Sequence, residues 1–509
     1  MISALRPDRP GPTRRWLVLT AMAAAVAVVT LDTTILNVAI PTIRADFDTS
    51  LTSLQWVIAG YSLTLGSLLI VGGRIGDLIG VRRSFMVGAL LFGTGSLIAS
   101  IAHTTATMVV GEALVEGIGA SLLFPASLAT LSMTFQGPLR EMAFAVWGGI
   151  AGAAAALGPV VGGWLTTDYS WRWGFRINVV IAPLAALGAW AALPSDVRRE
   201  RRTRLDVVGA GLLALGLFFV VFAVTEGPDQ GWAANQGHGL SVGGTRIWSA
   251  SWPISPVPLA ALIAIAVLAA FVGYERHEAA AGRSALVDLA MFARRSVSGG
   301  LATAATVVMA QAGMMFVLAV FLQATHHLDA VTAGRWLLPV GLAVLAGAQL
   351  GGRGAKKVGP TVVVRAGIVV QLTGMLLAAL LLRPSTGWAA LAVPLVVVGI
   401  GAGMASAQLT NVILSEIPRE RAGAASGVAT TTNSLGAALG VAVLGSALRA
   451  GTLANATSAR WALLAAVGLL AAGSVASFVI PVRRPVADGQ RKGDSAISDT
   501  TVAAGDQLR

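Results

Sequence analysis

Fourteen long apolar segments, separated by charged or Gly/Pro-rich stretches, dominate this 509-residue sequence. An α-helix needs about 20 apolar residues to cross the hydrocarbon core of a bilayer, and each segment approaches or exceeds that length. With 55% hydrophobic and only 12% charged residues, the chain lacks the polar surface of a soluble protein. The sequence therefore predicts an all-α polytopic membrane protein. Its spans are expected near residues 16–43, 54–73, 84–102, 107–134, 141–167, 174–193, 206–224, 256–274, 297–322, 333–352, 361–382, 388–414, 421–448 and 460–482.

The basic residues are unevenly distributed over the loops between these segments. A net charge of +12 would by itself also suit a nucleic-acid-binding protein, but the Lys and Arg residues are concentrated in alternate loops. Only eight of the 36 fall on the minority side: Arg44, Arg172, Arg176, Arg246, Arg335, Arg383, Arg449 and Arg460. Cytoplasmic loops carry an excess of basic residues. We therefore expect a multi-pass protein of the plasma membrane with both termini in the cytoplasm, and no nucleic-acid partner.

Several classes of site have no motif in this sequence. The absence of cysteine excludes disulfides, thiolate metal sites and cysteine nucleophiles. None of the three lysines stands in a P-loop motif, so the chain is not an ATP-driven pump by itself. His277-Glu278 is followed by alanines rather than by the second histidine of a zinc protease, and no channel filter motif is visible. We expect no enzyme, no catalytic residue, no metal site and no cofactor.

A glycine-rich cluster of charges follows the second segment, in "GGRIGDLIGVRRS". Glycines permit a tight turn, and the carboxylate can accept hydrogen bonds from helix-end N–H groups or from a basic partner. Such a cluster can latch two helix ends together, although a generic basic loop is the alternative. The candidate latch residues are Gly73, Asp77, Gly80, Arg82 and Arg83.

A second glycine cluster lies in the fifth segment, "GIAGAAAALGPVVGGWL". Proline removes a backbone donor and bends a helix, and glycines let a neighbouring helix approach its backbone. An ordinary kinked packing helix is the alternative. The central residues of this motif are Gly158, Pro159, Gly162 and Gly163.

Three further stretches complete a recognisable pattern: "LDTTILNVAIPTI" in the first segment, "SWRWGFRINV" after the fifth, and "ERAGAASGVATTTNSLGAALGVAVLG" in the thirteenth. Together with the two glycine clusters and the fourteen segments, they make the chain resemble the fourteen-span drug:proton antiporter family of the major facilitator superfamily. The resemblance extends from about Trp16 to Arg484. Within it, the first glycine cluster is similar to the cytoplasmic latch signature and the second to the antiporter motif.

The resemblance implies a major facilitator fold, with two six-helix bundles and an inserted two-helix hairpin. The N-terminal bundle would span residues 16–193, the hairpin with its outer loop 206–274, and the C-terminal bundle 297–482. A cytoplasmic segment 1–15, a cytoplasmic amphipathic linker 275–296 and a disordered cytoplasmic tail 483–509 would complete the chain. The substrate cavity would lie between the bundles and open alternately to each side.

Asp32 stands close to the middle of the first segment, in a run without charge from Trp16 to the next charged residue, Arg44. A carboxylate in the bilayer core costs about 2.5–3.5 kcal/mol on insertion scales, so it is a functional candidate. In the family this acid belongs to the first-span motif and is linked to proton or cationic substrate handling. A structural carboxylate that hydrogen-bonds within the bundle is the alternative.

Glu112 and Glu116 lie four residues apart on the fourth segment and therefore on one helix face. Two neighbouring carboxylates in a low dielectric cannot both ionise cheaply, so the pair is suited to loading and releasing a proton. Counted from the outer helix ends, Glu116 and Asp32 lie at similar depth. We expect these two acids to face a common water-accessible cavity, with Glu112 nearer the outer mouth. Glutamates in the headgroup zone are the alternative.

The sequence departs from the family at Ala113, where relatives commonly carry an arginine that is associated with proton transfer. The standard coupling route is therefore in question. No acid is evident in the core of the last six segments, whose polar residues are suited to hydrogen-bonding or to packing between helices. Candidate polar residues of the cavity are Asn37, Gln311, Gln408, Asn411 and Asn433.

These observations predict a secondary transporter that exports small amphipathic drugs, antibiotics or antiseptics by proton antiport. Its partners would be a small-molecule substrate, protons and the lipid bilayer, and it would act as a monomer. A proton-coupled importer or symporter of the same superfamily, for a small organic metabolite, is the alternative. Substrate identity, and the choice between Asp32 and the two glutamates as proton carrier, stay open at the level of the sequence.

Overall fold

The computed structural model describes residues 12–136, 138–193, 206–237, 239–242, 245–281, 286–287, 289–417, 422–449 and 456–482. Fourteen helical segments in this part of the chain are long and apolar enough to cross a membrane, which confirms the predicted number of spans. Most of the predicted N-terminal segment, residues 1–11, and the predicted tail from residue 483 onward lie outside the described residues.

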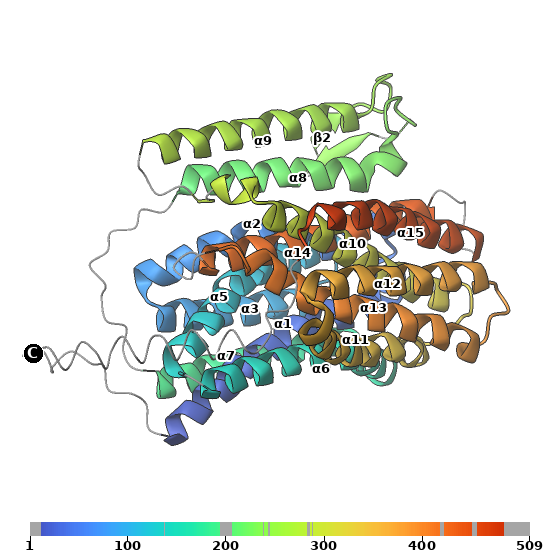
Figure 1. Cartoon of the computed structure of the whole chain (residues 1–509). Helices are drawn as coiled ribbons and strands as arrows, with labels where there is room; N and C mark the ends of the chain where they lie inside the picture. Colours follow the sequence, from blue (N-terminus) through green and yellow to red (C-terminus); the bar gives the residue numbers. More distant parts are fainter. Residues whose placement is uncertain are drawn as a thin grey trace, which may run out of the picture.

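The first six spans form the N-terminal bundle (Figure 1). The fourth span is built from three consecutive pieces, and its middle piece, η1, is a π-helix. The elements of this bundle are α1 (Pro12–Phe47), α2 (Leu51–Ile79), α3 (Val81–Ser100), α4 (Thr105–Met108), η1 (Val109–Glu116), α5 (Gly117–Thr134), α6 (Pro138–Asp168) and α7 (Arg172–Ala192).

The last six spans form the C-terminal bundle. Its helices are α10 (Arg295–Ala324), α11 (Ala330–Val358), α12 (Pro360–Leu381), α13 (Trp388–Leu414), α14 (Ala422–Arg449) and α15 (Ala456–Val479).

Helix boundaries follow local capping and turn chemistry in both bundles. The side chains of Ser50 and Asp329 accept hydrogen bonds from the backbone N–H groups of the first turns of α2 and α11, which would otherwise lack partners. A single glycine connects α2 to α3 and another connects α11 to α12. Gly80 has a φ of 98° and Gly359 a φ of 89°, a backbone conformation that residues with a Cβ rarely adopt.

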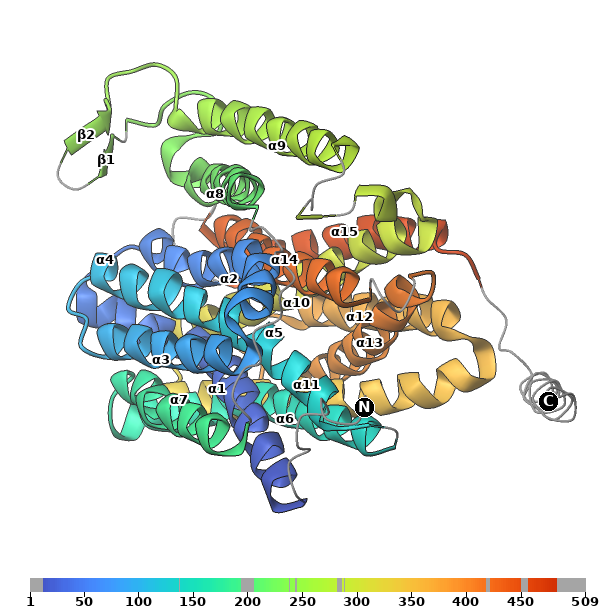
Figure 2. The same cartoon turned by 90° about the vertical axis from the view of Figure 1, so that its left-hand side faces the viewer.

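The inserted hairpin forms a separate layer beside the two bundles (Figures 1 and 2). It consists of α8 (Val207–Gln230), α9 (Pro256–Ala280) and, between them, the antiparallel strands β1 (Leu240–Val242) and β2 (Thr245–Trp248). The hairpin was expected to end near residue 274, but α9 continues to Ala280. Of the linker, where we expected an amphipathic helix, the described residues contain a five-residue 3₁₀ helix, η2 (Leu289–Ala293).

Only α8 of the hairpin packs closely against the bundles, and it contacts both. Its Val221 shares a small apolar cluster with Leu63 of α2 and Ala438 of α14. Trp56 of α2 donates a hydrogen bond to Glu226 of α8 over 2.7 Å. The helix therefore covers the line along which α2 and α14, and with them the two bundles, meet.

The bundles are hydrogen-bonded to each other near the ends of their helices on one side. We call this side outer, following the charge-based prediction; α1 ends there at Phe47. Gln323 Nε2 donates to the Val38 carbonyl over 2.8 Å, the Val331 N–H to Thr167 Oγ1 over 3.2 Å, and Gln55 Nε2 to the Val441 carbonyl over 3.4 Å. These three bonds are the outer seal.

In the opposite half, α2 and α14 still touch, because a Cβ at Gly427 would lie 3.7 Å from Ile70 Cγ1, whereas glycines of α6 and α11 have open space beside them. A Cβ added at Gly148 or Gly149 of α6, or at Gly352 of α11, would meet no described atom within 4 Å. Near the outer end the same two helices touch, because a Cβ at Gly334 would lie 2.0 Å from the Pro159 carbonyl oxygen. The three bonds of the outer seal and this close contact show that the chain is closed to the outer side.

Candidate functional site

The three predicted intramembrane acids come together in one cluster. Asp32 of α1 is 2% exposed, and Glu112 and Glu116 of η1 are fully buried. One carboxylate oxygen from each lies within 4.8 Å of those of the other two. We call these three residues the acid cluster. Asp32 and Glu116 thus lie together, as the depth comparison from the sequence suggested, and Glu112 lies with them. That Glu112 is the nearer of the two glutamates to the outer mouth stays a prediction.

The packing of η1 explains why the acids lie inside the bundle. Glycines at the contact let η1 approach α3 backbone to backbone: a Cβ at Gly95 would lie 2.5 Å from the Glu116 nitrogen, and one at Gly111 would lie 2.7 Å from the Ala99 nitrogen. The i→i+5 hydrogen bonds of a π-helix widen the turn but keep residues four apart on one face. The glutamates therefore face α1 and the bundle interior, instead of the water-accessible cavity that we expected.

Asn178 of α7 also belongs to the site, although it was not among the residues predicted from the sequence. Its Nδ2 group donates to Asp32 Oδ1 over 2.7 Å and to Glu116 Oε1 over 3.4 Å. Asn178 is 1% exposed and is the only Asn or Gln of α7. That isolation in an apolar helix is the one signal that could have found it.

A polar contact on the outer side fixes the start of α7 and therefore the position of Asn178. Arg172 forms an ion pair with Asp46 of α1 at 2.9 Å, and the indole of Trp171 donates to the same carboxylate over 3.1 Å. Arg172 also donates to the Ala102 carbonyl just after α3. The "SWRWGFRINV" stretch thus ties α7 to α1 and α3, the helices on either side of the acid cluster.

The acid cluster has more acceptors than donors. Asp32 Oδ2, Glu116 Oε2 and both oxygens of Glu112 are buried and accept no hydrogen bond from a described N–H or O–H group. Among the described residues no Lys, Arg or His forms an ion pair with these acids. Burying three uncompensated carboxylates would cost several kcal/mol for each. The cluster is therefore suited to binding protons. Oxygen atoms at this spacing can also hold a cation, so the absence of a metal site stays a prediction.

The predicted latch residues lie at the junction of α2 and α3. Gly73 and Asp77 belong to the last turns of α2, and Gly80 forms the turn itself. Arg82 Nη2 donates to the Trp190 carbonyl in the last turn of α7 over 2.6 Å. This bond closes a helix end within the N-terminal bundle. The latch role of the motif, including Arg83, stays a prediction.

The glycines of the predicted antiporter motif lie where α1, α6 and α11 meet. A Cβ at Gly158 would overlap the Thr34 hydroxyl at 1.8 Å, and one at Gly162 would lie 2.8 Å from the Ile35 Cα, so both hold α6 against α1. A Cβ at Gly163 would lie 2.3 Å from the Ala330 carbonyl oxygen, so this glycine holds α6 against α11 of the other bundle. The motif therefore packs the acid-bearing helix and the line between the bundles at once.

The predicted polar residues of the cavity are spread over α1, α10, α13 and α14. Asn37 donates back to the Thr33 carbonyl over 2.8 Å, and Asn411 donates to Gln408 Oε1 over 3.2 Å. Gln408 is buried, whereas Gln311 and Asn433 are half-buried. None of the five belongs to the acid cluster, and their contact with substrate stays a prediction.

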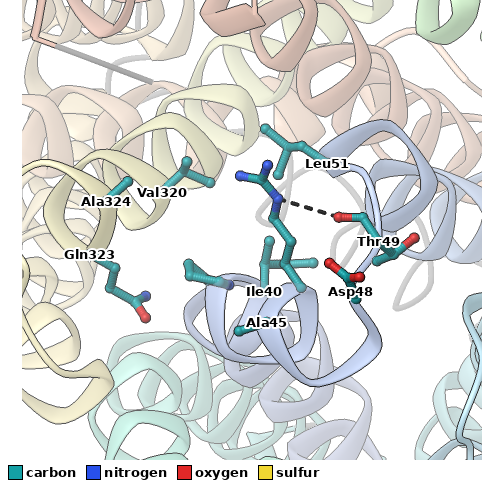
Figure 3. A pocket seen from close by; sticks show the side chains of 10 residues that line it. Ile40, Ala45, Asp48, Thr49, Leu51, Val320, Gln323 and Ala324 are labelled. Atoms are coloured by element: carbon teal, nitrogen blue, oxygen red, sulfur yellow. Dashed lines mark hydrogen bonds between the residues drawn. The ribbon is translucent and has the colours of Figure 1, made fainter. Parts of the chain in front are cut away.

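A pocket of about 360 Å³ lies at the outer seal, between the end of α1, the start of α2 and the end of α10 (Figure 3). Gln323, which donates to α1 in the seal, lines it on one side, and Asp48 and Thr49 line it on the other. The Nε group of Arg44 donates to the Thr49 carbonyl over 3.4 Å. The pocket therefore lies between the outer ends of the two bundles.

Comparison with known proteins identifies the family. The family model described as Major Facilitator Superfamily matches residues 22–441. The chain belongs to this superfamily. Relatives include a probable actinorhodin transporter of Streptomyces coelicolor, 33% identical over 87% of this chain and 76% of that protein, and the tetracenomycin C resistance and export protein of Streptomyces glaucescens, 32% identical over 88% and 78%. The puromycin resistance protein of Streptomyces alboniger is 32% identical over 86% and 82%.

A solved structure supports the fold of this major facilitator. It is a bacterial homologue of the human lysosomal transporter Spinster in an inward-facing, unoccupied conformation. Its TM-score to this chain is 0.60 at 15% identity, and the match covers 92% of this chain and 98% of that one. With relatives that are export and resistance proteins, the predictions of a multi-pass membrane protein, of the superfamily and of efflux transport are confirmed.

Proposed function

We propose that this major facilitator exports small amphipathic drugs, antibiotics or antiseptics in exchange for protons. It works by alternating access in the plasma membrane, as a monomer with both termini in the cytoplasm, and its energy source is the proton gradient rather than a cofactor. The observation that carries the proposal is the acid cluster, three buried carboxyl groups without a described counter-ion.

The position of the acid cluster supports coupling between protons and the movement of the bundles. Asp32 lies on α1, and the same helix supplies the Val38 carbonyl of the outer seal. Through Gly158 and Gly162, α1 also packs against α6, which contacts α11 of the other bundle. A change in the charge of the cluster therefore acts on a helix that takes part in closing the outer side.

The relatives support the class of substrate. Two of them carry names that refer to tetracenomycin C and to puromycin, and a third is named as a probable actinorhodin transporter. We therefore place small amphipathic antibiotics first among the compounds to test.

Transport into proteoliposomes with an imposed pH gradient tests this function, with puromycin and tetracenomycin C as probes. For protein in the orientation whose cytoplasmic face points outward, we expect accumulation when the interior is acidic, together with alkalinisation of the interior as protons leave. Accumulation that ignores the pH gradient, or that follows a sodium gradient instead, would refute proton antiport. Accumulation only when the exterior is acidic would favour the importer or symporter.

A further inference from the structure

Two members of the acid cluster, Asp32 and Glu116, accept a hydrogen bond from Asn178, and the third, Glu112, does not. Asn178 Nδ2 can only donate, and it lies within hydrogen-bond distance of both Asp32 Oδ1 and Glu116 Oε1. Both oxygens of Glu112 are buried and accept no hydrogen bond from a described N–H or O–H group. Asp32 and Glu116 are thus supported as acceptors, and Glu112 is not.

A buried carboxyl group that is surrounded by acceptors is satisfied if it carries the proton itself. Glu112 lies beside the carboxyl groups of Asp32 and Glu116, and each of them has one oxygen without a described donor. A hydroxyl on Glu112 could donate to either of these oxygens. When ionised, Asp32 and Glu116 each keep the hydrogen bond from Asn178, whereas an ionised Glu112 would have no described donor. Leaving a buried charged acceptor without a donor is the more costly arrangement.

We propose that Asn178 is a positioning residue that holds Asp32 and Glu116 as hydrogen-bond acceptors, so that the coupling proton resides on Glu112. This inference rests on the proposed proton antiport and names the atoms that carry it. The proton is held on a Glu112 oxygen in the conformation that is closed to the outer side. It leaves to water when the bundles move and the cluster is hydrated.

Beyond the acid cluster, the titratable group that faces Glu112 in the described part of the chain is a tyrosine. The titratable groups that face Glu112 are Asp32 from α1, Glu116 from η1 and the hydroxyl of Tyr61 from α2. Ser96 of α3, which lies beside Glu116, and Asn178 of α7 do not titrate. The Tyr61 hydroxyl is buried without a described partner and is a second neutral donor available to the carboxylates.

Infrared difference spectroscopy on the purified protein, without drug, tests where the proton resides. The carbonyl stretch of a protonated carboxylic acid should be present at neutral pH and lost at alkaline pH. We expect Glu112→Gln to lack this band yet to fold normally, because the new amide donates to Asp32 and Glu116 as the proton would. We expect Asp32→Asn to keep the band, since Glu112 can still donate to Glu116. A band that survives in Glu112→Gln and disappears in Asp32→Asn would overturn the assignment.

The positioning role of Asn178 is tested by the pH at which the band disappears. Without the amide donor, the ionised forms of Asp32 and Glu116 each lose a hydrogen bond. The cluster should therefore keep its proton to a pH higher by at least about one unit, since each hydrogen bond to a charged group is worth about that much. Asn178→Leu and the smaller Asn178→Ser should both show this shift, which guards against a folding defect in either. An unchanged pH dependence in a folded variant would contradict the role.

Gln371→Leu is the matched control. Gln371 is a fully buried amide of α12, in the C-terminal bundle, and donates to the Val307 carbonyl over 3.5 Å. Its loss should leave the band and its pH dependence as in the unaltered protein, and a shift of the size seen for Asn178→Leu would refute the inference. Because no drug is present, a cluster that binds no proton at any pH would sink the proposed antiport itself. A proton found on another acid would sink only this assignment.

Discussion

The two bundles share a framework but differ in what they bury. In each, a positive-φ glycine joins two helices, Gly80 in one and Gly359 in the other. In each, an arginine of the following helix donates to carbonyls at the end of the bundle's last helix, Arg82 to α7 and Arg365 to α15. The helices of the C-terminal bundle, however, contain no Asp or Glu.

In the proposed proton antiport, this difference would separate two tasks, the response to protons and the movement of one bundle against the other. The N-terminal bundle concentrates titratable groups at one point, where a change in charge acts on α1. The C-terminal bundle buries amides and hydroxyls, such as Gln371, Gln408 and Thr431, which form hydrogen bonds without exchanging protons near neutral pH. Under the proposed proton antiport, one bundle responds to protons and the other is the partner against which it moves.

The largest effect should come from neutralising the acids. Asp32→Asn and Glu116→Gln should each reduce transport driven by a pH gradient to the level of empty liposomes, because the cluster loses acceptors on which the proton depends. Gln408→Leu, in the other bundle, should raise KM for puromycin and leave the dependence on the pH gradient intact. Proteoliposome transport measures both. Unchanged transport in both acid variants would show that the buried acids of the N-terminal bundle do not couple transport to the pH gradient, so the two bundles would not differ in this function.

An acid placed in the C-terminal bundle should be poorly tolerated. Gln371→Glu would bury a carboxylate with no amide bridge like that of Asn178, at a cost of about 2.5–3.5 kcal/mol at neutral pH. The cost should shrink at acidic pH, where the new carboxyl group is neutral. Thermal unfolding in detergent at two pH values measures the effect, with Gln371→Leu as control. Equal stability of Gln371→Glu at both pH values would show that the two interiors do not differ in this respect.

Arg82 and Arg365 make corresponding contacts in the two bundles, so replacing each in turn compares how much those contacts contribute to the free energy of unfolding. Arg365 makes three partly buried hydrogen bonds, to the carbonyls of Ser477 and Ile480, whereas the bond from Arg82 to Trp190 is exposed. We expect Arg365→Ala to lower the free energy of unfolding by about 1–3 kcal/mol and Arg82→Ala to lower it less. Thermal unfolding of the two variants side by side decides, and the reverse order would contradict this prediction.

The smallest effect is expected at the hydrogen bonds that hold α8 of the inserted hairpin against the two bundles. Trp56→Phe removes the bond to Glu226 and should weaken the docking of α8 by about 1 kcal/mol. Ser446→Ala should have less effect, because the Ser446 hydroxyl, which donates to the Val224 carbonyl of α8, also donates to Ala442 in its own helix. Hydrogen–deuterium exchange of α8 reports both. Faster exchange in Ser446→Ala than in Trp56→Phe would assign the hairpin to the C-terminal bundle.

The sequence predicted those features for which a membrane imposes a large energy. Fourteen spans follow from the length of apolar segments, and the acid cluster follows from the cost of burying charge in lipid, which selected Asp32, Glu112 and Glu116. A neutral amide costs much less to bury in lipid than a charge, so this criterion did not select Asn178, although it donates hydrogen bonds to two of the three acids. The burial of the cluster was also missed, because it depends on the contact that Gly95 and Gly111 allow between η1 and α3.

The outer seal has a consequence for how such a sequence can diverge. Each of its three bonds joins a side chain of one bundle, Gln55, Thr167 or Gln323, to a backbone group of the other. Every residue has a backbone carbonyl, and every residue except proline has an N–H, so the partner positions can change identity and the bond survives. Three side chains therefore specify the hydrogen bonds of the outer seal, while positions 38, 331 and 441 of the facing helices contribute only backbone groups to them.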